Sequence, residues 1–176
     1  MTALDHSLPT SIRTLRLTLR APEQTDIADI VAMANNANIF ATTATLPFPY
    51  TTAHAEDFVA GAERASGTGP YVMAGRDNRV MGVMSLKLAA GSLPELGYWL
   101  GEPHWGQGYA TEAAIGLLAA VRHLPGFAEV EARALESNKG SVRVLEKAGF
   151  TLFERSTGTL ERHREKPILV MRWRAA

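Results

Sequence analysis

Three absences narrow what this protein can be. The sequence has no cysteine among its 176 residues, which excludes disulfides and a cysteine nucleophile. Its 18 basic and 18 acidic residues cancel, which argues against a nucleic-acid binder with a broad basic surface. Neither the opening MTALDHSLPTSIRT nor any later stretch has the apolar run of a signal peptide or a membrane span. We therefore expect a cytoplasmic protein that works on neither nucleic acid nor membrane.

The remaining composition is ordinary for a folded domain. Hydrophobic residues make up 46% and charged residues 20% of the chain, as in typical soluble globular proteins. The sequence shows no repeat, low-complexity tract or linker, and its length suits one α+β domain with a sizeable core. We expect a flexible leader over residues 1–12 and a single domain over residues 13–176.

Hydrophobic periodicity predicts the order of the elements. Alternation of apolar and polar residues predicts strands over residues 15–20, 70–74, 80–87, 96–100, 130–134, 150–155 and 168–173. Helical spacing predicts helices after a cap at Thr25, from about Thr52 to before Gly67, from Ala110, and between a cap at Asn138 and Gly149. A turn at Asp77 and Asn78 makes 70–74 and 80–87 an antiparallel hairpin.

Residues 35–51 follow neither period. Asparagines give way to Phe40, Leu46, Phe48 and Tyr50, with two prolines among them. A long irregular apolar loop is often a binding surface, but a loop that packs on the core would have the same composition. We keep both interpretations.

The stretch LGYWLGEPHWGQGYATEAA, residues 96–114, is the strongest local signal. It combines a strand, a loop with Gly106 and Gly108, and the first turns of a helix. A helix N-terminus presents unpaired N–H groups and the positive end of the helix dipole, and glycines let a ligand approach the backbone closely. These properties suit a phosphate or pyrophosphate, although a tight turn alone would explain the two glycines.

Two common phosphate-binding motifs do not fit this loop. No Gly-Lys-Ser/Thr follows the glycines, as a Walker loop would require. Thr111 stands where the dinucleotide fingerprint has its third glycine. Because no charged side chain lies in the turn itself, the backbone N–H groups and Thr111 would have to hold any anion.

Two blocks together resemble the GNAT N-acetyltransferases. WGQGYATEA, residues 105–113, is similar to the acetyl-CoA loop of this family, and NKGSVRVLEKAGF, residues 138–150, is similar to the segment after the fifth strand. LRLTLR at 15–20 and LPFPYT at 46–51, each followed by a helix, also match the expected order. The branch that contains the ribosomal-protein N-terminal acetyltransferases fits best. The resemblance covers nearly the whole chain.

The resemblance implies a GNAT-like acyl-CoA N-acyltransferase fold, with a mixed, mostly antiparallel sheet of about six to seven strands flanked by helices. It implies acetyl-CoA as cosubstrate and an amine as acceptor, in a monomer or homodimer, and residues 35–51 would border the acceptor site. The cofactor arm would lie along residues 96–100 and its pyrophosphate on the glycine loop. The implied contacts are Tyr98, Leu100, Trp105, Gly106, Gln107, Gly108, Tyr109, Ala110, Thr111, Asn138 and Ser141.

Acetyl transfer to an amine needs three chemical roles. The backbone N–H of Tyr98 would meet the thioester carbonyl, and Glu95 is our candidate base, acting through water. Many relatives have a tyrosine acid where this chain has Leu145, so Ser141 is our candidate acid. The alternative interpretations are a solvated Glu95 at a strand edge and a helix-capping role for Ser141.

Other candidate groups carry weaker signals. Glu131 and Glu136 are alternative bases, and His104 precedes the glycines, where a surface or packing role is more common. His54 and His163 have no local signal. Trp105 departs from the glutamine or arginine that many relatives have at its position, and no His, Asp and Glu cluster has metal-ligand spacing.

Three functions are consistent with these patterns. The first is an N-acetyltransferase that acts on a protein N-terminal α-amine or on a small amine by direct attack in a ternary complex. The second is a CoA-binding regulatory module without catalysis, which the missing tyrosine and uncertain base would suit. The third is a nucleotide-phosphate binder that uses the glycine loop.

Overall fold

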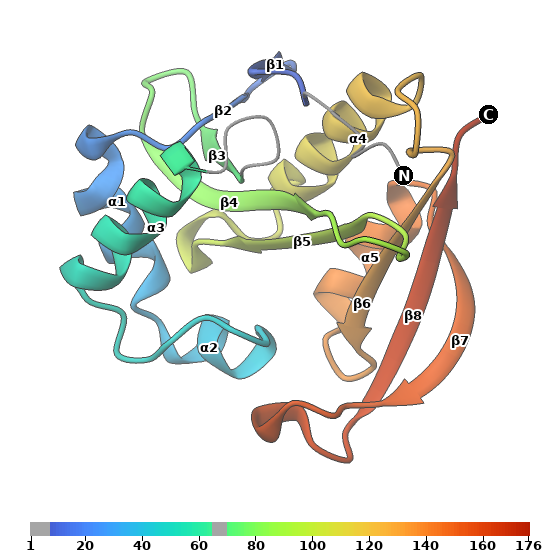
Figure 1. Ribbon diagram of the computed structural model, residues 1–176. Coiled ribbons are helices and arrows are strands. Elements are labelled where there is room, and N and C mark those ends of the chain that lie inside the picture. The colour runs from blue at the N-terminus through green and yellow to red at the C-terminus, as the bar shows by residue number, and fades with distance from the viewer. Residues whose placement is uncertain (1–7, 65–69) are drawn as a thin grey trace.

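One sheet runs through the part of the chain that the computed structural model describes, residues 8–64 and 70–176 (Figure 1). Within these residues the sheet has eight strands in the order β1-β2-β3-β4-β5-β6-β8-β7. They are β1 Ser11–Arg13, β2 Thr18–Arg20, β3 Tyr71–Ala74, β4 Val80–Lys87, β5 Glu95–Leu100, β6 Glu129–Leu135, β7 Thr151–Thr157 and β8 Pro167–Arg174. Neighbours are antiparallel except for β5 and β6, which are parallel. The mixed, mostly antiparallel sheet is confirmed, with one strand more than the upper expectation.

Helices cover both faces of this sheet (Figure 1). The α-helices are α1 Ile27–Ala34, α2 Ala37–Thr42, α3 Thr52–Arg64, α4 Tyr109–Val121 and α5 Lys139–Lys147. Short 3-10 turns lie at η1 Gln24–Asp26, η2 Glu102–His104 and η3 Glu161–His163. No helix in the described ranges is long and apolar enough to cross a membrane.

The core consists of two hydrophobic clusters on opposite faces. The larger cluster packs α4 and α5 on the sheet, and the smaller packs α1 and α3 on the other side. Consecutive β4 residues Val83 and Met84 enter different clusters, because successive side chains of a strand point to opposite faces. The predicted stripe of α4 is confirmed: Ala110, Ala113, Ala114, Leu117, Leu118 and Val121 are all buried. Each buried leucine contributes about 2 kcal/mol to folding.

The first strand differs from the prediction. Residues 15–20 do not form one strand, because the chain turns between β1 and β2, where the Thr14 N–H donates to the Leu17 carbonyl at 2.9 Å. Leu15 is 80% exposed, and only the second half of the alternating pattern enters the sheet. Part of the expected leader is structured, since Leu8 and Ile12 are buried. Residues 1–7 of that leader, and the expected helix stop at Gly67, lie outside the described residues.

The chain after β2 also differs in detail. Thr25 does not cap a helix; it lies inside η1, and Asp26 instead accepts a hydrogen bond from the Glu23 N–H at 2.8 Å. In residues 35–51, expected to be irregular, Asn36 accepts from two backbone N–H groups and starts α2. The caps predicted for α5 are confirmed: Asn138 accepts from the Ser141 N–H, and Gly149 follows the helix at φ +95°.

A buried ion pair ties β2 to η1. Both guanidinium ends of Arg20 contact the Asp26 carboxylate, at 2.7 and 2.9 Å, and Asp26 is 3% exposed. The bond to Asp26 raises the pKa of Arg20. Removing one partner of such a pair leaves an uncompensated charge in the interior.

We predict that Asp26→Ala lowers the free energy of unfolding by about 3 kcal/mol, because Arg20, whose side chain is only 14% exposed, loses its carboxylate partner. Urea denaturation with an unchanged slope would measure this loss. The control is Arg79→Gln, which breaks a 2.6 Å pair with Asp29 whose arginine side chain is 73% exposed. Its loss should be under about 1 kcal/mol. Equal losses in the two variants would contradict the prediction.

Candidate functional site

The site begins where β5 and β6 separate. The Glu131 N–H donates to the Pro94 carbonyl at 2.8 Å, and within the described strands the pairing of β5 with β6 ends at Leu96 and Ala132. Figure 1 shows the two strands diverging beyond this point. Backbone groups of alternate residues point the same way in a strand, so those of Tyr98 and Leu100 face the space that β6 vacates.

A cavity of about 1400 Å³ occupies this space. Its walls come from β5, β6, the glycine loop, α5, the segment after α2 and the β7–β8 connection. The predicted site residues in its lining are Glu95, Tyr98, Leu100, Trp105, Gly106, Gly108, Tyr109, Ala110, Thr111, Asn138 and Ser141. Of the predicted set, Gln107 is the residue that the lining leaves out. The structure thus brings the two sequence blocks together around one cavity.

The glycine loop ends on an open helix N-terminus. Gly106 and Gly108 have φ angles of +72° and +81°, a region that residues with a Cβ rarely adopt. Gly108 is the N-cap of α4 and offers no side-chain cap. The first helical bond runs from the Glu112 N–H to the Gly108 carbonyl, so Tyr109, Ala110 and Thr111 have N–H groups without an intrahelical acceptor. The loop therefore has the free N–H groups that the predicted anion site requires, and anion binding itself stays a prediction.

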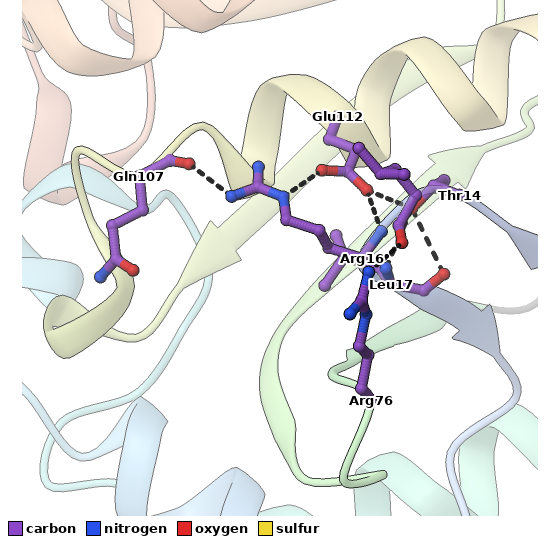
Figure 2. Close-up of polar contacts among 7 residues, drawn as sticks. Thr14, Arg16, Leu17, Arg76, Gln107 and Glu112 are labelled. Carbon is purple, nitrogen blue, oxygen red and sulfur yellow. Dashed lines mark hydrogen bonds and ion pairs between the residues drawn. The ribbon is translucent and has the colours of Figure 1, made fainter.

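A carboxylate in the first turn of α4 fixes this loop to the β1–β2 turn (Figure 2). Glu112 accepts three hydrogen bonds of 2.6 Å, from the Thr14 hydroxyl, the Arg16 N–H and the Arg16 Nε. Burial raises the pKa of Glu112, but the bonds from Thr14 and Arg16 and the positive charge of Arg16 outweigh it, and the net shift is downward. The carboxylate therefore stays charged at neutral pH.

Arg16 carries this support onto the glycine loop itself. Its Nη1 donates to the Gln107 carbonyl at 2.9 Å (Figure 2). Its guanidinium lies 4.2 Å from the centre of the Tyr109 ring. Gln107 turns its side chain away from the cavity, toward the Pro103 carbonyl at 3.0 Å. The sequence did not predict that Arg16 and Glu112 support the glycine loop. Glu112 lies within the motif at residues 105–113, so that motif was the available signal for it.

Tyr98 and Ser141 meet across the cavity wall. The Tyr98 hydroxyl lies 2.7 Å from Ser141 Oγ, and the Ser141 N–H donates to Asn138 Oδ1 at 3.2 Å. Burial raises the pKa of Tyr98 to about 12, against a smaller lowering from the bond to Ser141. Tyr98 therefore remains protonated at any working pH.

Trp105 takes one of the expected cofactor contacts for itself. Its Nε1 donates to the Leu100 carbonyl at 2.6 Å, while 44% of the residue is exposed. The Leu100 carbonyl thus has an internal partner, and the Leu100 N–H, with both backbone groups of Tyr98, remains directed to the gap.

The candidate bases have different surroundings. Glu95 lines the cavity where β5 and β6 are still paired; its side chain is 41% exposed and lies 3.8 Å from Arg133 Nε. Glu131 is enclosed between Arg133 and Arg172, which indicates a structural ion pair. Glu136 pairs with the exposed Arg155.

Among the described residues no three His, Cys, Asp or Glu side chains gather as a metal site.

The three histidines considered from the sequence, His54, His104 and His163, each have a contact within the protein. His104 packs its ring on Tyr109, and His54 Nδ1 accepts from the Thr51 N–H at 3.1 Å. His163 is buried, with its Nε2 3.2 Å from the Ala41 carbonyl.

The far wall of the cavity is held by one arginine. Arg162 of η3 donates to the carbonyls of Phe40, Thr43 and Leu46 at 3.0, 2.7 and 3.0 Å, and lies 3.5 Å over the Phe40 ring. Residues 35–51 pack on the core and also border the cavity, since Leu46 and Tyr50 pack on the smaller core cluster and line the cavity. Their role as a binding surface stays a prediction.

We predict that Glu112→Gln lowers the free energy of unfolding by about 2 kcal/mol at pH 7, because the charged acceptor of three bonds is lost. A lowered folded-state pKa means that this contribution is present above the unfolded-state pKa of about 4.3 and disappears as pH falls through the folded-state value. Urea titrations from pH 7 downward should therefore show the two proteins converging. Glu129→Gln, whose partner Arg174 is 72% exposed, is the control with a near-zero effect. A pH-independent difference would contradict the prediction.

Comparison with known proteins agrees with this geometry. A 77-residue region, 42% of this chain and 42% of the relative, is 39% identical to a probable N-acetyltransferase, YjcK of Bacillus subtilis. The chain thus matches about two fifths of the length of that curated relative. The fold is similar to Mycobacterium smegmatis RimJ, solved with CoA-disulfide, with TM-score 0.81 and 20% identity over 95% of this chain and 88% of that one.

A third similarity extends over nearly both whole chains. The microcin C7 self-immunity acetyltransferase MccE, solved with acetyl-CoA and AMP, has TM-score 0.82 and 17% identity, and the match covers 96% of this chain and 98% of that one. The model of the family described as acetyltransferase (GNAT) domain matches residues 16–151, from the β1–β2 turn to the first residue of β7. Because this family model covers well over half of the chain, the chain belongs to the GNAT acetyltransferase family.

Proposed function

We propose that this protein transfers the acetyl group of acetyl-CoA to a primary amine by direct attack in a ternary complex. Acetyl-CoA is the cosubstrate of the family. The observation that carries the proposal is that the β5–β6 gap and the open N-terminus of α4 line one cavity. A long thioester carrier with a pyrophosphate needs both features at once.

The cofactor lies along this cavity with its charged end at the loop. The N–H groups of residues 106–111 bind the pyrophosphate, helped by the Thr111 hydroxyl and the helix dipole. The pantetheine arm follows β5 as an added strand would, bonding both backbone groups of Tyr98 and the N–H of Leu100. Asn138 can add a side-chain amide bond near the end of the arm, in addition to capping α5.

Acetyl transfer then proceeds at the gap. The neutral amine nitrogen attacks the thioester carbon, the C–N bond forms, and the C–S bond breaks with its electron pair going to sulfur. The Tyr98 N–H donates to the carbonyl oxygen as its negative charge develops, and one such donor contributes about 3 kcal/mol. Glu95 accepts the proton of the amine through water, and the Ser141 hydroxyl donates to the leaving sulfur.

The charges around the cavity favour one class of acceptor. Among the described lining residues, Asp57 and Glu95 are the carboxylates, and the basic side chains are Lys87, Arg133, Arg143 and Lys147. A polyamine would need the opposite balance, because each extra ammonium group requires an acidic partner. We therefore favour an acceptor with a single amine, such as the N-terminal α-amine of a peptide.

A CoA-binding regulatory module without catalysis is the second candidate. Leu145, where many relatives have a tyrosine acid, is 1% exposed and packs in the core, so it supports no proton transfer. Thiol release from acetyl-CoA across a panel of free-N-terminus peptides and small amines separates the two functions. Release with at least one amine supports the enzyme, and tight CoA binding without release from any of them supports the module.

We predict that CoA raises the melting temperature well beyond ATP or NAD at equal concentration, because stabilisation follows the logarithm of the ligand excess over Kd. Thermal unfolding of the full chain measures all three shifts. If ATP matched or exceeded CoA, a nucleotide-phosphate binder would replace both CoA-dependent functions.

We predict that Gly108→Val weakens CoA binding by about tenfold or more while the protein stays folded. A Cβ at this position would lie 3.5 Å from Arg16 Nη2, beside the N–H groups proposed to bind the pyrophosphate, and φ +81° strains a β-branched residue, so the loop would have to change shape. Gly91→Val is the matched control, since Gly91 has φ +76° in the β4–β5 connection and does not line the cavity. Calorimetric titration with CoA should separate the two variants. Unchanged CoA affinity in folded Gly108→Val protein would refute the loop assignment.

A further inference from the structure

Two hydroxyl groups meet where β5 passes the first turn of α5. The Tyr98 side chain packs on the larger core cluster, and its hydroxyl lies 2.7 Å from Ser141 Oγ. It lies farther, at 3.3 Å, from the Ser141 carbonyl. The two residues are 43 positions apart in the sequence, and both line the cavity. The contact joins the strand proposed to hold the thioester to the residue proposed to face its sulfur.

Either oxygen could donate in the 2.7 Å contact, and the bond lengths and the acidity of the two groups favour Tyr98 as the donor. A separation of 2.7 Å is the usual length of an O–H···O bond, whereas 3.3 Å to the carbonyl is beyond the usual range. A phenol is a stronger donor than an aliphatic alcohol, and the alcohol is the better acceptor. Each hydroxyl has one hydrogen, so a Ser141 oxygen that accepts from Tyr98 keeps its own hydrogen for another partner.

Few protein acceptors compete for that remaining hydrogen. Ser141 lies in the first turn of α5, where the carbonyls accept bonds from the next turn of the helix. The Asn138 oxygen already accepts the Ser141 N–H at 3.2 Å. The cavity, which Ser141 lines, is the open direction.

We propose that the Tyr98 side chain is a positioning residue, whose hydroxyl donates to Ser141 Oγ and thereby directs the Ser141 hydrogen at the sulfur of CoA. This inference rests on the proposed function, in which the C–S bond breaks and its electron pair goes to that sulfur. A hydroxyl that accepts one hydrogen bond donates a stronger one, so the Tyr98 bond increases the stabilisation that Ser141 gives the thiolate. Tyr98 loses no proton in this step, and burial, which raises its pKa to about 12, keeps it a donor.

The first experiment needs CoA alone and no acceptor. A hydrogen bond to the thiolate lowers the pKa of the thiol of bound CoA, which its ultraviolet thiolate absorbance reports during a pH titration. We expect Ser141→Ala to raise this thiol pKa by about one unit and Tyr98→Phe by about half a unit. The lining charges of Glu95, Arg133 and Arg143 are the same in every variant, so differences among variants report the hydroxyls.

Two further variants serve as controls. Tyr71→Phe removes another buried tyrosine hydroxyl, which bonds the Pro9 carbonyl and has its pKa raised to about 12, but which lies outside the cavity lining. It should lower stability and leave the CoA thiol unchanged. Ser141→Thr keeps a hydroxyl and should stay within a few tenths of a unit of the unmodified chain.

Kinetics with the best acceptor from the amine panel give the second readout. Tyr98→Phe should lower kcat about fivefold with unchanged KM for acetyl-CoA, because the lost bond acts on the leaving group. Ser141→Ala should cost more, and the double variant no more than Ser141→Ala alone, since Tyr98 acts through the serine. A structural role for Tyr98 would instead shift the melting temperature and KM.

The experiments distinguish failure of the Tyr98 role from failure of the proposed acetyltransferase function. If Tyr98→Phe leaves the thiol pKa and kcat unchanged while Ser141→Ala alters both, Tyr98 does not position the serine. If the losses of kcat from Tyr98→Phe and Ser141→Ala add up in the double variant, Tyr98 likewise does not act through the serine. If the unmodified chain binds no CoA, the proposed function itself fails, and the positioning role fails with it.

Discussion

The divergence of two parallel strands is the constraint on which the rest of the structure depends. After Leu96 and Ala132, β5 and β6 are no longer paired by backbone hydrogen bonds. The backbone groups of Tyr98 and Leu100 therefore face an open gap. A sheet closed at this position would leave no room for the cavity between β5 and β6. The cavity, the exposed N-terminus of α4 and the Ser141 end of α5 all lie around this separation.

A bare main-chain loop can bind an anion well only if its shape is fixed. Here the support comes from the N-terminal segment of the chain. Glu112 binds Thr14 and Arg16, and Arg16 donates to the Gln107 carbonyl. The short strands β1 and β2 therefore do more than extend the sheet. Their connecting turn is the support of the loop, which explains why the chain bends outward at Leu15 instead of continuing as one strand.

Patterns that depend on neighbouring residues were predictable from the sequence, and contacts over long separations were not. The α4 stripe and the Asn138 cap follow from local spacing, and both are confirmed. The alternation at 15–20 was misleading because a carboxylate 96 residues away stabilises the turn that interrupts it. The bond between Tyr98 and Ser141 likewise joins distant segments. The glycine loop and its neighbours were found by motif and line one cavity, while their binding roles stay predictions.

The hydrogen bonds from Arg162 to the segment around and after α2 have a consequence for how the shape of the cavity can change in evolution. The wall of the cavity opposite the loop is shaped by carbonyls of Phe40, Thr43 and Leu46 that converge on a single guanidinium. The glycine loop is held by a separate set of contacts, made by Glu112 and Arg16. Substitutions around Arg162 can therefore reshape this wall of the cavity without breaking the hydrogen bonds that hold the glycine loop.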